Sequence, residues 1–538
     1  MDMPPQNSKK EVLFYSPFSG IWKHSLAEFS LMKLVAKRYT VKVIRCEQTF
    51  HEFCTVMNAK GIAISGTRYE KKSICAGCLK NANLLQDPNF QVLSYLSKFE
   101  DQESQDLEKK INEAGAEDLI RFEFLEVPVG KISAFETIIK FKKTNLNFVD
   151  SEIELLRIKI KHAVRSVMIA REILAANTPR CVFVFNPEYT VGGAFADYCA
   201  RLGIKVYSVK FTYNASENTR SVLVWNWERY KLRSPALDVW ENGDRKINKK
   251  ELVRASRHLD NVLKSNSPFV YSTQSTGKSS REFFGIPRSK KILLLAMSSY
   301  DEGFANFTAG LTKYSPLDGK VFSSQIEWVL STINFVKDLN DVALIIRPHP
   351  RELANRRDSV TSEHSSQVEL ALQNLPQNVY VDWPKFGYSI YDHFNETQAL
   401  VTGWSSAGME AMMSGIPCVS YDSRLVDFPG DIHFTGDSQQ EYFENIMRSL
   451  ENYDSATIRY NVLHWYAFAF SRGTIQLGGV VHDQIIFRRF PLSRRFADIL
   501  EYRFPGIAKR FEIKVGSNRK EQAKLLKLID FSADNLFE

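Results

Sequence analysis

Short strand-like runs alternate with helical runs along this chain, and this alternation constrains the fold more than any other feature. The first strand is predicted at "EVLFYS", an amphipathic helix at "LAEFSLMKLVAKR" and a second strand at "YTVKVIRC". The spacing of apolar residues changes there from strand-like to helix-like and back. The same order recurs in "RCVFVFNPEYTVGGAFADYCARLGIKVYSV". Strands that alternate with helices in this way form parallel sheets.

A second series of strands and helices predicts a second domain. The chain has 538 residues, which is long for one hydrophobic core. Residues 265–290 are rich in Ser, Thr and Gly, and the alternation restarts after them with "KKILLLAMSS". We therefore predict an α/β protein of two Rossmann-like lobes with a central cleft. Its three parts are a first lobe with a charged helical insertion (1–275), a second lobe (276–475) and a basic C-terminal helical segment (476–538).

The positive charge of the chain is concentrated near its C-terminus. The formal net charge is +8, and residues 488–527 hold twelve basic residues against four acidic ones. The basic residues alternate with Phe, Ile, Leu and Tyr, a composition that suits an anionic membrane surface or a polyanionic partner. The alternative is a helical segment that packs its aromatic residues back on the first lobe. Nucleic acid is not an expected partner, because no recognised nucleic-acid-binding motif accompanies the charge.

Four of the seven cysteines fall within one short region. They are Cys46, Cys54, Cys75 and Cys78, and "SICAGCLK" contains a C-x2-C pair of the kind found in structural zinc sites. The alternative is buried, apolar cysteines with no metal, which we favour. No apolar run has the length of a signal peptide or a membrane-spanning helix. We expect reduced thiols and a cytoplasmic protein, either free or peripheral on the inner face of the membrane.

The residues that follow the strands of the second lobe are the candidate ligand-binding residues. In an open parallel sheet, ligands bind beyond the carboxyl ends of the strands. The first such turn is "MSSYDEGF", which holds Asp301, Glu302 and Gly303. Adjacent acids before a glycine can supply a base, bind a sugar hydroxyl or cap the next helix.

The second turn, "IIRPHPRE", places His349 between two prolines. Proline restricts its own backbone and that of its predecessor, so the imidazole is held in one direction. With Arg347 and Arg351 beside it, the turn is predicted to bind an anion.

The third turn, "GWSSAGMEA", places Ser405 and Ser406 where a helix begins. A helix N-terminus offers free backbone N–H groups, and two hydroxyls would add hydrogen-bond donors toward a phosphate. The alternative is an ordinary serine cap.

Taken together, these turns resemble the nucleotide-binding lobe of GT-B glycosyltransferases, in particular those of bacterial capsule and surface-polysaccharide biosynthesis. The matching pieces are "YDEG", "SSQIEW", "IIRPHPRE", "YSIYD" and "VTGWSSAGMEAMMSGIPCVSYD". Bacterial sialyltransferases and some Kdo transferases, which use CMP-activated acidic sugars, are similar in an acidic pair before glycine, a His-Pro pair and a Ser-Ser pair. In the sialyltransferases the acidic pair lies in the first lobe, whereas here it opens the second.

The resemblance implies a nucleotide-sugar donor in the second lobe and a surface-polysaccharide, capsule or lipid-linked glycan acceptor in the first. It implies that His349, Ser405 and Ser406 bind the donor phosphates and that Glu410 contacts a ribose. The whole set of residues implied to line the donor site is Glu302, Gly303, Arg347, His349, Pro350, Ser389, Tyr391, Ser405, Ser406 and Glu410. Such enzymes usually need no bound metal, and no cofactor is expected beyond the structural zinc raised above. An inverting transfer needs a base, and the candidates are His24, Glu188 and Asp301.

Three other functions fit parts of the sequence. One is an enzyme of the UDP-N-acetylglucosamine 2-epimerase type, although its usual "DSGG" turn is missing here. Another is a transferase that uses a CDP-linked polyol phosphate. The third is a non-catalytic binding protein of a polysaccharide assembly.

Overall fold

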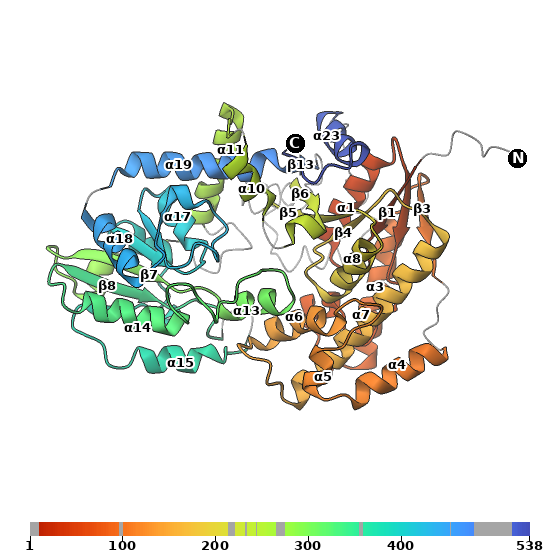
Figure 1. Ribbon diagram of the computed structural model, residues 1–538, viewed down its shortest axis with the longest axis horizontal. Coiled ribbons are helices and arrows are strands. Elements are labelled where there is room, and N and C mark those ends of the chain that lie inside the picture. Colours follow the sequence, from red (N-terminus) through yellow and green to blue (C-terminus); the bar gives the residue numbers. More distant parts are fainter. Residues whose placement is uncertain are drawn as a thin grey trace, which may run out of the picture.

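The protein folds into two α/β lobes, as the computed structural model in Figure 1 shows. The structure describes residues 10–95, 101–212, 221–231, 234–243, 245–264, 275–354, 359–451, 453–477 and 519–537. The first lobe comprises the described residues up to 231 together with 474–537, and the second comprises those from 234 to 472. Each lobe is built on one sheet, so the prediction of two Rossmann-like lobes is confirmed.

The sheet of the first lobe has seven strands in the order β13-β6-β5-β4-β1-β2-β3. The strands β1 to β5 run parallel, whereas β6 and β13 each pair antiparallel with their neighbours. Their bounds are β1 Glu11–Tyr15, β2 Thr40–Ile44, β3 Phe90–Leu93, β4 Cys181–Phe185, β5 Val206–Phe211, β6 Ser221–Asn226 and β13 Thr474–Gln476.

Helices cover both faces of this sheet. The helices of the lobe are α1 Trp22–Val35, α2 Thr55–Ala59, α3 Arg68–Leu84, α4 Gln102–Glu113, α5 Ala116–Ile120, α6 Val129–Phe141, α7 Asp150–Ala176, α8 Thr190–Arg201, α9 Trp227–Tyr230 and α23 Arg519–Asp530. Alternate residues of β1 point to opposite faces. Val12 and Phe14 pack with α1 and α23, and Leu13 and Tyr15 pack with α2, α7 and α8. Strands buried on both faces explain the continuous apolar runs in the sequence.

The sheet of the second lobe has six strands, all parallel, in the order β12-β11-β10-β7-β8-β9. The strands are β7 Lys291–Ala296, β8 Val342–Arg347, β9 Val379–Val381, β10 Ala399–Thr402, β11 Cys418–Ser420 and β12 Phe434–Thr435. The strand β7 is central, and its side chains enter a separate core on each face.

Three helices of the second lobe precede its first strand, and the others lie between or after its strands. They are α10 Pro235–Asn242, α11 Lys249–Leu263, α12 Ser280–Phe284, α13 Tyr300–Thr308, α14 Gln325–Val336, α15 His364–Ala371, α16 Ile390–Phe394, α17 Ala407–Met413, α18 Gln439–Glu451 and α19 Ser455–Ala467, with the short turns η2 Pro384–Phe386, η3 Gly430–Ile432 and the π-helical η4 Phe468–Arg472. The helices α10 and α11 precede residue 276, the predicted start of this lobe. Both nevertheless contribute to its hydrophobic core, where α11 packs against α19.

The chain returns to the first lobe at its C-terminal end. The strand β13 pairs with β6, and α23 lies against α1, so the C-terminus lies near the first sheet in Figure 1. The hydroxyl of Tyr207 on β5 donates to the carbonyls of Leu528 and Ala533 at 3.0 and 2.9 Å. The basic residues of the predicted C-terminal segment before Arg519 lie outside the described residues. Within the described part of the chain, no helix is both long and apolar enough to cross a membrane.

Candidate functional site

The three predicted turns meet at one edge of the second sheet. The first turn is joined to the third, because the Trp404 backbone N–H donates to Ser298 Oγ at 2.8 Å. It is joined to the second by an ion pair between Asp301 and Arg351, at 2.8 Å. The strands β10, β7 and β8 are neighbours in the parallel sheet, so their carboxyl ends bring these turns together.

Asp301, a predicted catalytic base, is instead buried in the contact between the lobes. Its side chain is 1% exposed, and Arg351 Nε donates to both carboxylate oxygens, at 3.0 and 2.8 Å. Burial raises the pKa of Asp301 to about 6, although Arg351 lowers it. The same guanidinium donates to the carbonyl of Ile139 on α6, at 2.7 Å. Asp301 therefore fixes a contact with the first lobe through Arg351.

Glu302 is the accessible member of the acidic pair. Its side chain is 43% exposed and lies 3.7 Å from Arg351 Nε. The negative charge of Glu302 raises the pKa of both His349 and Tyr189, and Tyr189 belongs to the first lobe. Gly303 allows the turn to pack closely, since a methyl group there would lie 3.3 Å from Pro316. The carboxylate of Glu302 thus lies between the lobes.

Arg347, predicted to bind phosphate, is buried in a polar network. It forms an ion pair with Asp382, and its Nη2 donates to the carbonyl of Tyr388 at 3.0 Å. His393 Nε2 lies 2.8 Å from the same Asp382 carboxylate. Both Arg347 and Asp382 are at most 5% exposed, so this arginine holds the end of β8 in place and does not face a ligand.

His349 is fixed by the backbone and is neutral near pH 7. Its Nδ1 accepts a hydrogen bond from the Arg351 backbone N–H, at 3.2 Å. Burial lowers the pKa of His349, although Glu302 and Glu352 raise it. A neutral imidazole whose Nδ1 accepts carries its proton on Nε2. With Pro350 beside it, this half-buried residue is a directed hydrogen-bond donor at the exit of β8.

The two serines of the third turn differ in their surroundings. Ser405 Oγ accepts from the Ala407 backbone N–H at 3.3 Å, as a capping serine does. Ser406 is exposed, and its hydroxyl donates to Glu410 at 3.2 Å. Ser405 therefore accepts from the first N–H of α17, while the N-cap position itself is Ser406, whose side chain makes no capping hydrogen bond.

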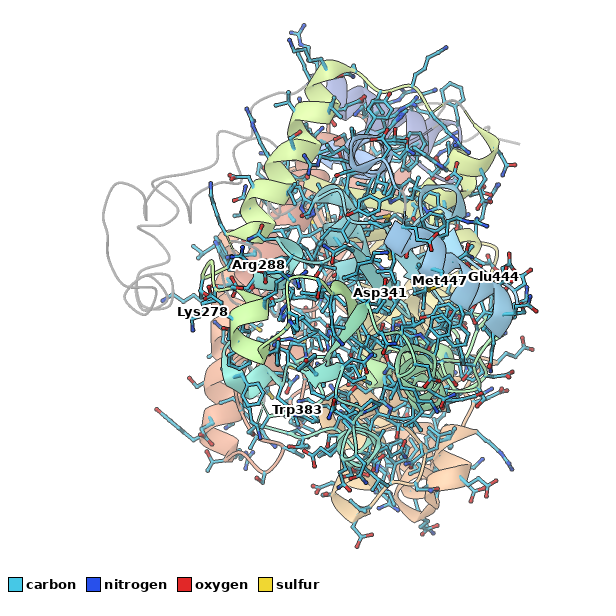
Figure 2. All side chains as sticks on the ribbon, turned by 90° about the vertical axis from the view of Figure 1, so that its left-hand side faces the viewer. Lys278, Arg288, Asp341, Trp383, Glu444 and Met447 are labelled. Atoms are coloured by element: carbon cyan, nitrogen blue, oxygen red, sulfur yellow. The ribbon has the colours of Figure 1, made fainter. Side chains whose placement is uncertain are left out.

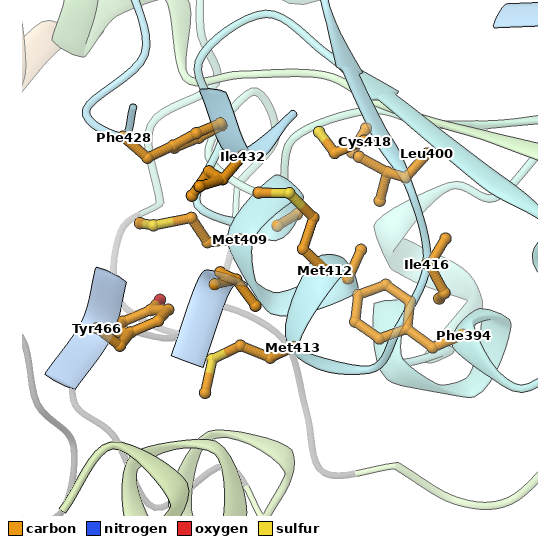
Figure 3. Close-up of a cluster of buried hydrophobic side chains, with 14 of the residues drawn as sticks. Phe394, Leu400, Met409, Met412, Met413, Ile416, Cys418, Phe428, Ile432 and Tyr466 are labelled. Carbon is orange, nitrogen blue, oxygen red and sulfur yellow. The ribbon is translucent and has the colours of Figure 1, made fainter. Parts of the chain in front are cut away.

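Glu410, Tyr391 and Ser389 lie deeper than predicted. Tyr391 donates to Glu410 at 3.0 Å, and burial raises the pKa of that carboxyl group. Ser389 is fully buried and caps α16. The helix α17 is enclosed because its three methionines pack among the aromatic side chains that Figure 3 shows. These three predicted ligand residues contact one another or the backbone in this structure.

At the strand exits of the first lobe, His24 and Glu188 lie beside β4 and β5. The ring of His24 is 4.6 Å from that of Phe185, and burial lowers the pKa of His24 to about 4. Glu188 forms an ion pair with Lys210, near the end of β5. His24 is therefore neutral near pH 7, and Glu188 is neutralised by a cation.

Two further residues between the lobes were missed by sequence reasoning. Asp427 follows β11 and is exposed, yet surrounding protein raises its pKa to about 6 while Lys210 of the first lobe lowers it. Tyr189 is 36% exposed, and burial raises its pKa to about 12. Solvent reaches part of each side chain, while the protein atoms around it raise its pKa. The strand-exit rule could have found Asp427, since it follows the predicted strand "IPCVSYD".

The four clustered cysteines line one small cavity in the first lobe. Its volume is about 30 Å³, and Cys46, Cys54, Cys75 and Cys78 all contribute to its wall. Burial raises the pKa of each thiol, with Cys46 and Cys78 at about 12. Within the described ranges, no three His, Cys, Asp or Glu side chains are arranged to hold a metal ion. Cys54 and Cys75 are buried and Cys46 and Cys78 are half-buried around this cavity, and the structural zinc stays a prediction.

Comparison with known proteins finds similar solved structures but no matching family model and no matching curated protein. A β-Kdo 2,4-transferase, KpsC of Thermosulfurimonas dismutans, is 14% identical, with 54% of this chain and 79% of that chain covered and a TM-score of 0.32. The UDP-GlcNAc 2-epimerase of Methanocaldococcus jannaschii is 10% identical, with 84% and 98% covered and a TM-score of 0.29. The spinosyn rhamnosyltransferase SpnG is 10% identical, with 89% and 99% covered and a TM-score of 0.27. Similarity at this level carries no information about donor, acceptor or reaction.

Proposed function

We propose that this chain is a glycosyltransferase that moves a sugar from a nucleotide-sugar donor to a glycan or lipid-linked acceptor. The observation that carries the proposal is the placement of His349. This neutral imidazole is held at the exit of β8 by the Arg351 backbone N–H. His349 lies close enough to Glu302 for that carboxylate to raise the imidazole pKa. The same carboxylate raises the pKa of Tyr189 in the first lobe. The motif resemblance supplies the reaction class, and the position of these groups between two lobes supports it.

The donor phosphates are assigned to the second lobe. The Nε2–H of His349 is a fixed donor that needs no charge to bind a phosphate oxygen, and Ser405 and Ser406 follow the neighbouring turn. Fixed donors of this kind stabilise the charge that develops on a leaving phosphate, which is why we propose transfer without a bound metal. The donor that we propose first is a CMP-activated acidic sugar, because the acidic pair before glycine, the His-Pro pair and the Ser-Ser pair resemble those of enzymes that use such donors.

The acceptor is assigned to the first lobe, with Asp427 as the base. Its carboxylate is exposed, and its pKa of about 6 lies close to neutral pH. A base is most effective when it is ionised at the working pH yet retains affinity for a proton. Lys210, which lowers this pKa, brings a positive charge from the first lobe to the same place.

Nucleotide binding tests the donor site directly. Calorimetric titration would compare CMP, CDP, UDP and GDP on the wild-type protein, on His349→Ala and on Ser405→Ala/Ser406→Ala. Because a hydrogen bond to a charged group contributes about 1.5–3 kcal/mol, His349→Ala should weaken the best nucleotide at least about tenfold. The control is His51→Ala, since His51 is exposed in the first lobe. Equal affinity of wild type and His349→Ala would exclude this donor site.

A product assay tests the reaction class. The nucleotide sugar that corresponds to the best nucleotide would be incubated with the enzyme, with and without glycan acceptors. Transfer predicts a glycosylated acceptor and release of free nucleotide. Conversion of the nucleotide sugar into an epimer without an acceptor would show the competing reaction and contradict the proposal.

A further inference from the structure

An exposed aromatic patch with a positive rim lies on the second lobe. Phe283 lies in the last turn of α12 and Phe386 ends η2, and these residues are 43% and 44% exposed. Their ring centroids are 5.9 Å apart. Among the exposed large apolar side chains of the described residues, these two are the only pair in ring contact. Single exposed apolar residues are common, whereas two exposed rings in contact form a continuous apolar area on the surface.

The pair is presented on a rigid base. The ring of Phe283 lies 4.4 Å from that of Tyr388, which is buried. The helix α12 is anchored at its start, where Ser280 Oγ lies 2.6 Å from His393 Nδ1 and the Arg281 backbone N–H donates to Glu396 at 3.0 Å. Because the rings are already held in place, little conformational freedom is lost when a partner covers them.

The surroundings of the pair are strongly positive. Five basic residues belong to the same turns, against the single exposed acid Glu282: Lys278, Arg281, Arg288, Lys290 and Lys385. None of the five forms an ion pair with a described residue, and the Nζ atoms of Lys278 and Lys385 lie 5.2 and 5.9 Å from the ring centroids of Tyr388 and Phe386. Figure 2 shows Lys278 and Arg288 on the same side of this lobe in that view. The charge of the patch is therefore free to attract an anionic partner.

We propose that this patch, the two phenylalanines with their five basic neighbours, docks on an anionic lipid bilayer. Aromatic rings enter the headgroup region of a bilayer while lysine and arginine contact anionic headgroups, which is the combination found here. The charge of such a surface suits five uncompensated cations. Single-stranded nucleic acid is bound along a positively charged groove with a row of stacking rings, whereas this patch presents one pair of rings in contact with each other. The site is separate from the residues assigned to sugar transfer, so the inference does not depend on that function.

Vesicle co-sedimentation of the full-length protein tests the inference. The probes are vesicles of phosphatidylcholine alone and of phosphatidylcholine with an equal amount of phosphatidylglycerol. Wild type should bind the anionic vesicles and lose that binding as salt increases. The variant Phe283→Ser/Lys385→Glu should bind at least about tenfold more weakly, since each basic residue near an anionic surface contributes roughly fivefold.

A matched variant on the first lobe controls for the effect on vesicle binding of losing any exposed aromatic ring and reversing any surface charge. Tyr69 is 83% exposed on α3, and Lys72 is exposed one turn later. Tyr69→Ser/Lys72→Glu therefore removes one exposed aromatic ring and reverses one charge, as the patch variant does, and should bind within about twofold of wild type. The control variant should unfold at the wild-type temperature, because both of its replaced side chains are exposed. Phe283→Ser loses the contact with Tyr388 and should unfold at a lower temperature, so vesicle binding is compared at a temperature where both variants are folded.

Three results would overturn the inference. The first is unchanged vesicle binding of the patch variant, which would place any membrane contact elsewhere in the chain. The second is an equal loss in both variants, which would show a general effect of charge. The third is binding of a single-stranded oligonucleotide that depends on Phe283 while vesicles do not bind.

Discussion

Replacement of Glu28 by glutamine should remove a pH-dependent loss of stability from the first lobe. Glu28 lies on α1 and is 5% exposed, and Ser16 Oγ donates to its carboxylate at 2.7 Å. Burial raises its pKa to about 8, although the Ser16 hydrogen bond and Arg45 both lower it. The folded protein therefore keeps Glu28 protonated at neutral pH.

The magnitude follows from the pKa values of about 8 in the folded state and 4.5 for an ordinary glutamate. One pKa unit corresponds to about 1.4 kcal/mol, so the proton stabilises the fold by about 5 kcal/mol at low pH. That contribution is complete below about pH 4.5, falls as the unfolded chain ionises, and is lost as pH rises through about 8. About 3 kcal/mol of it disappears between about pH 5 and about pH 8.

Urea unfolding of wild type and Glu28→Gln across this pH range measures the effect. Glutamine is neutral at every pH and can still accept from Ser16. The free energy of unfolding of wild type should therefore fall by about 3 kcal/mol relative to that of the variant between about pH 5 and about pH 8. The control is Glu113→Gln, an exposed position on α4, which should change stability by less than about 0.5 kcal/mol. Parallel pH profiles for wild type and Glu28→Gln would refute a buried, protonated Glu28.

Four further substitutions have defined outcomes. Asp427→Asn should abolish the inflection near pH 6 in the pH profile of turnover, because the protein that surrounds this solvent-reached carboxylate raises its pKa to about 6. If the inflection persists in the variant, another group is the base. Tyr207→Phe removes the hydroxyl that binds two carbonyls of the C-terminal segment, so thermal unfolding should show a loss of about 1–3 kcal/mol and proteolysis of that segment should accelerate. Gly415→Ala should lower the unfolding temperature, because Gly415 has a φ of +85° and the added methyl would lie 2.0 Å from Ser455 Oγ. In contrast, Gly77→Ala on α3 should stabilise by about 1 kcal/mol, since nothing lies within 4 Å of the new methyl.

The meeting of the three turns could be predicted because it depends on topology alone. In parallel strands all carboxyl ends lie at one edge, so Ser298 and Trp404 come together once β7 and β10 are neighbours. The apolar runs and the helical periodicities were sufficient to place these strands in order. No knowledge of individual side-chain directions was needed for this step.

Which charged side chains face a ligand could not be predicted in the same way. Asp301 and Arg347 end in buried ion pairs whose partners lie 50 and 35 residues away in the sequence. Burial of a charge depends on such a partner, and local spacing does not reveal it. Asp427 has no distant ion-pair partner among the described residues and stays exposed, but it belongs to none of the motifs that drew attention to the other turns.

The strand β13 makes the first lobe the last part of the protein to be completed during synthesis. Its partner β6 ends at residue 226 and β13 begins at residue 474, so the ribosome adds 474 − 226 = 248 residues between the end of β6 and the start of β13. At a translation rate of about 5–20 residues per second, the open edge of β6 waits roughly 12 to 50 seconds for its neighbour. An unpaired strand edge is a template for pairing with other chains. Nascent chains of this protein therefore carry an exposed β-edge while nearly half of the 538 residues are added, and a chain that terminates before residue 474 keeps it.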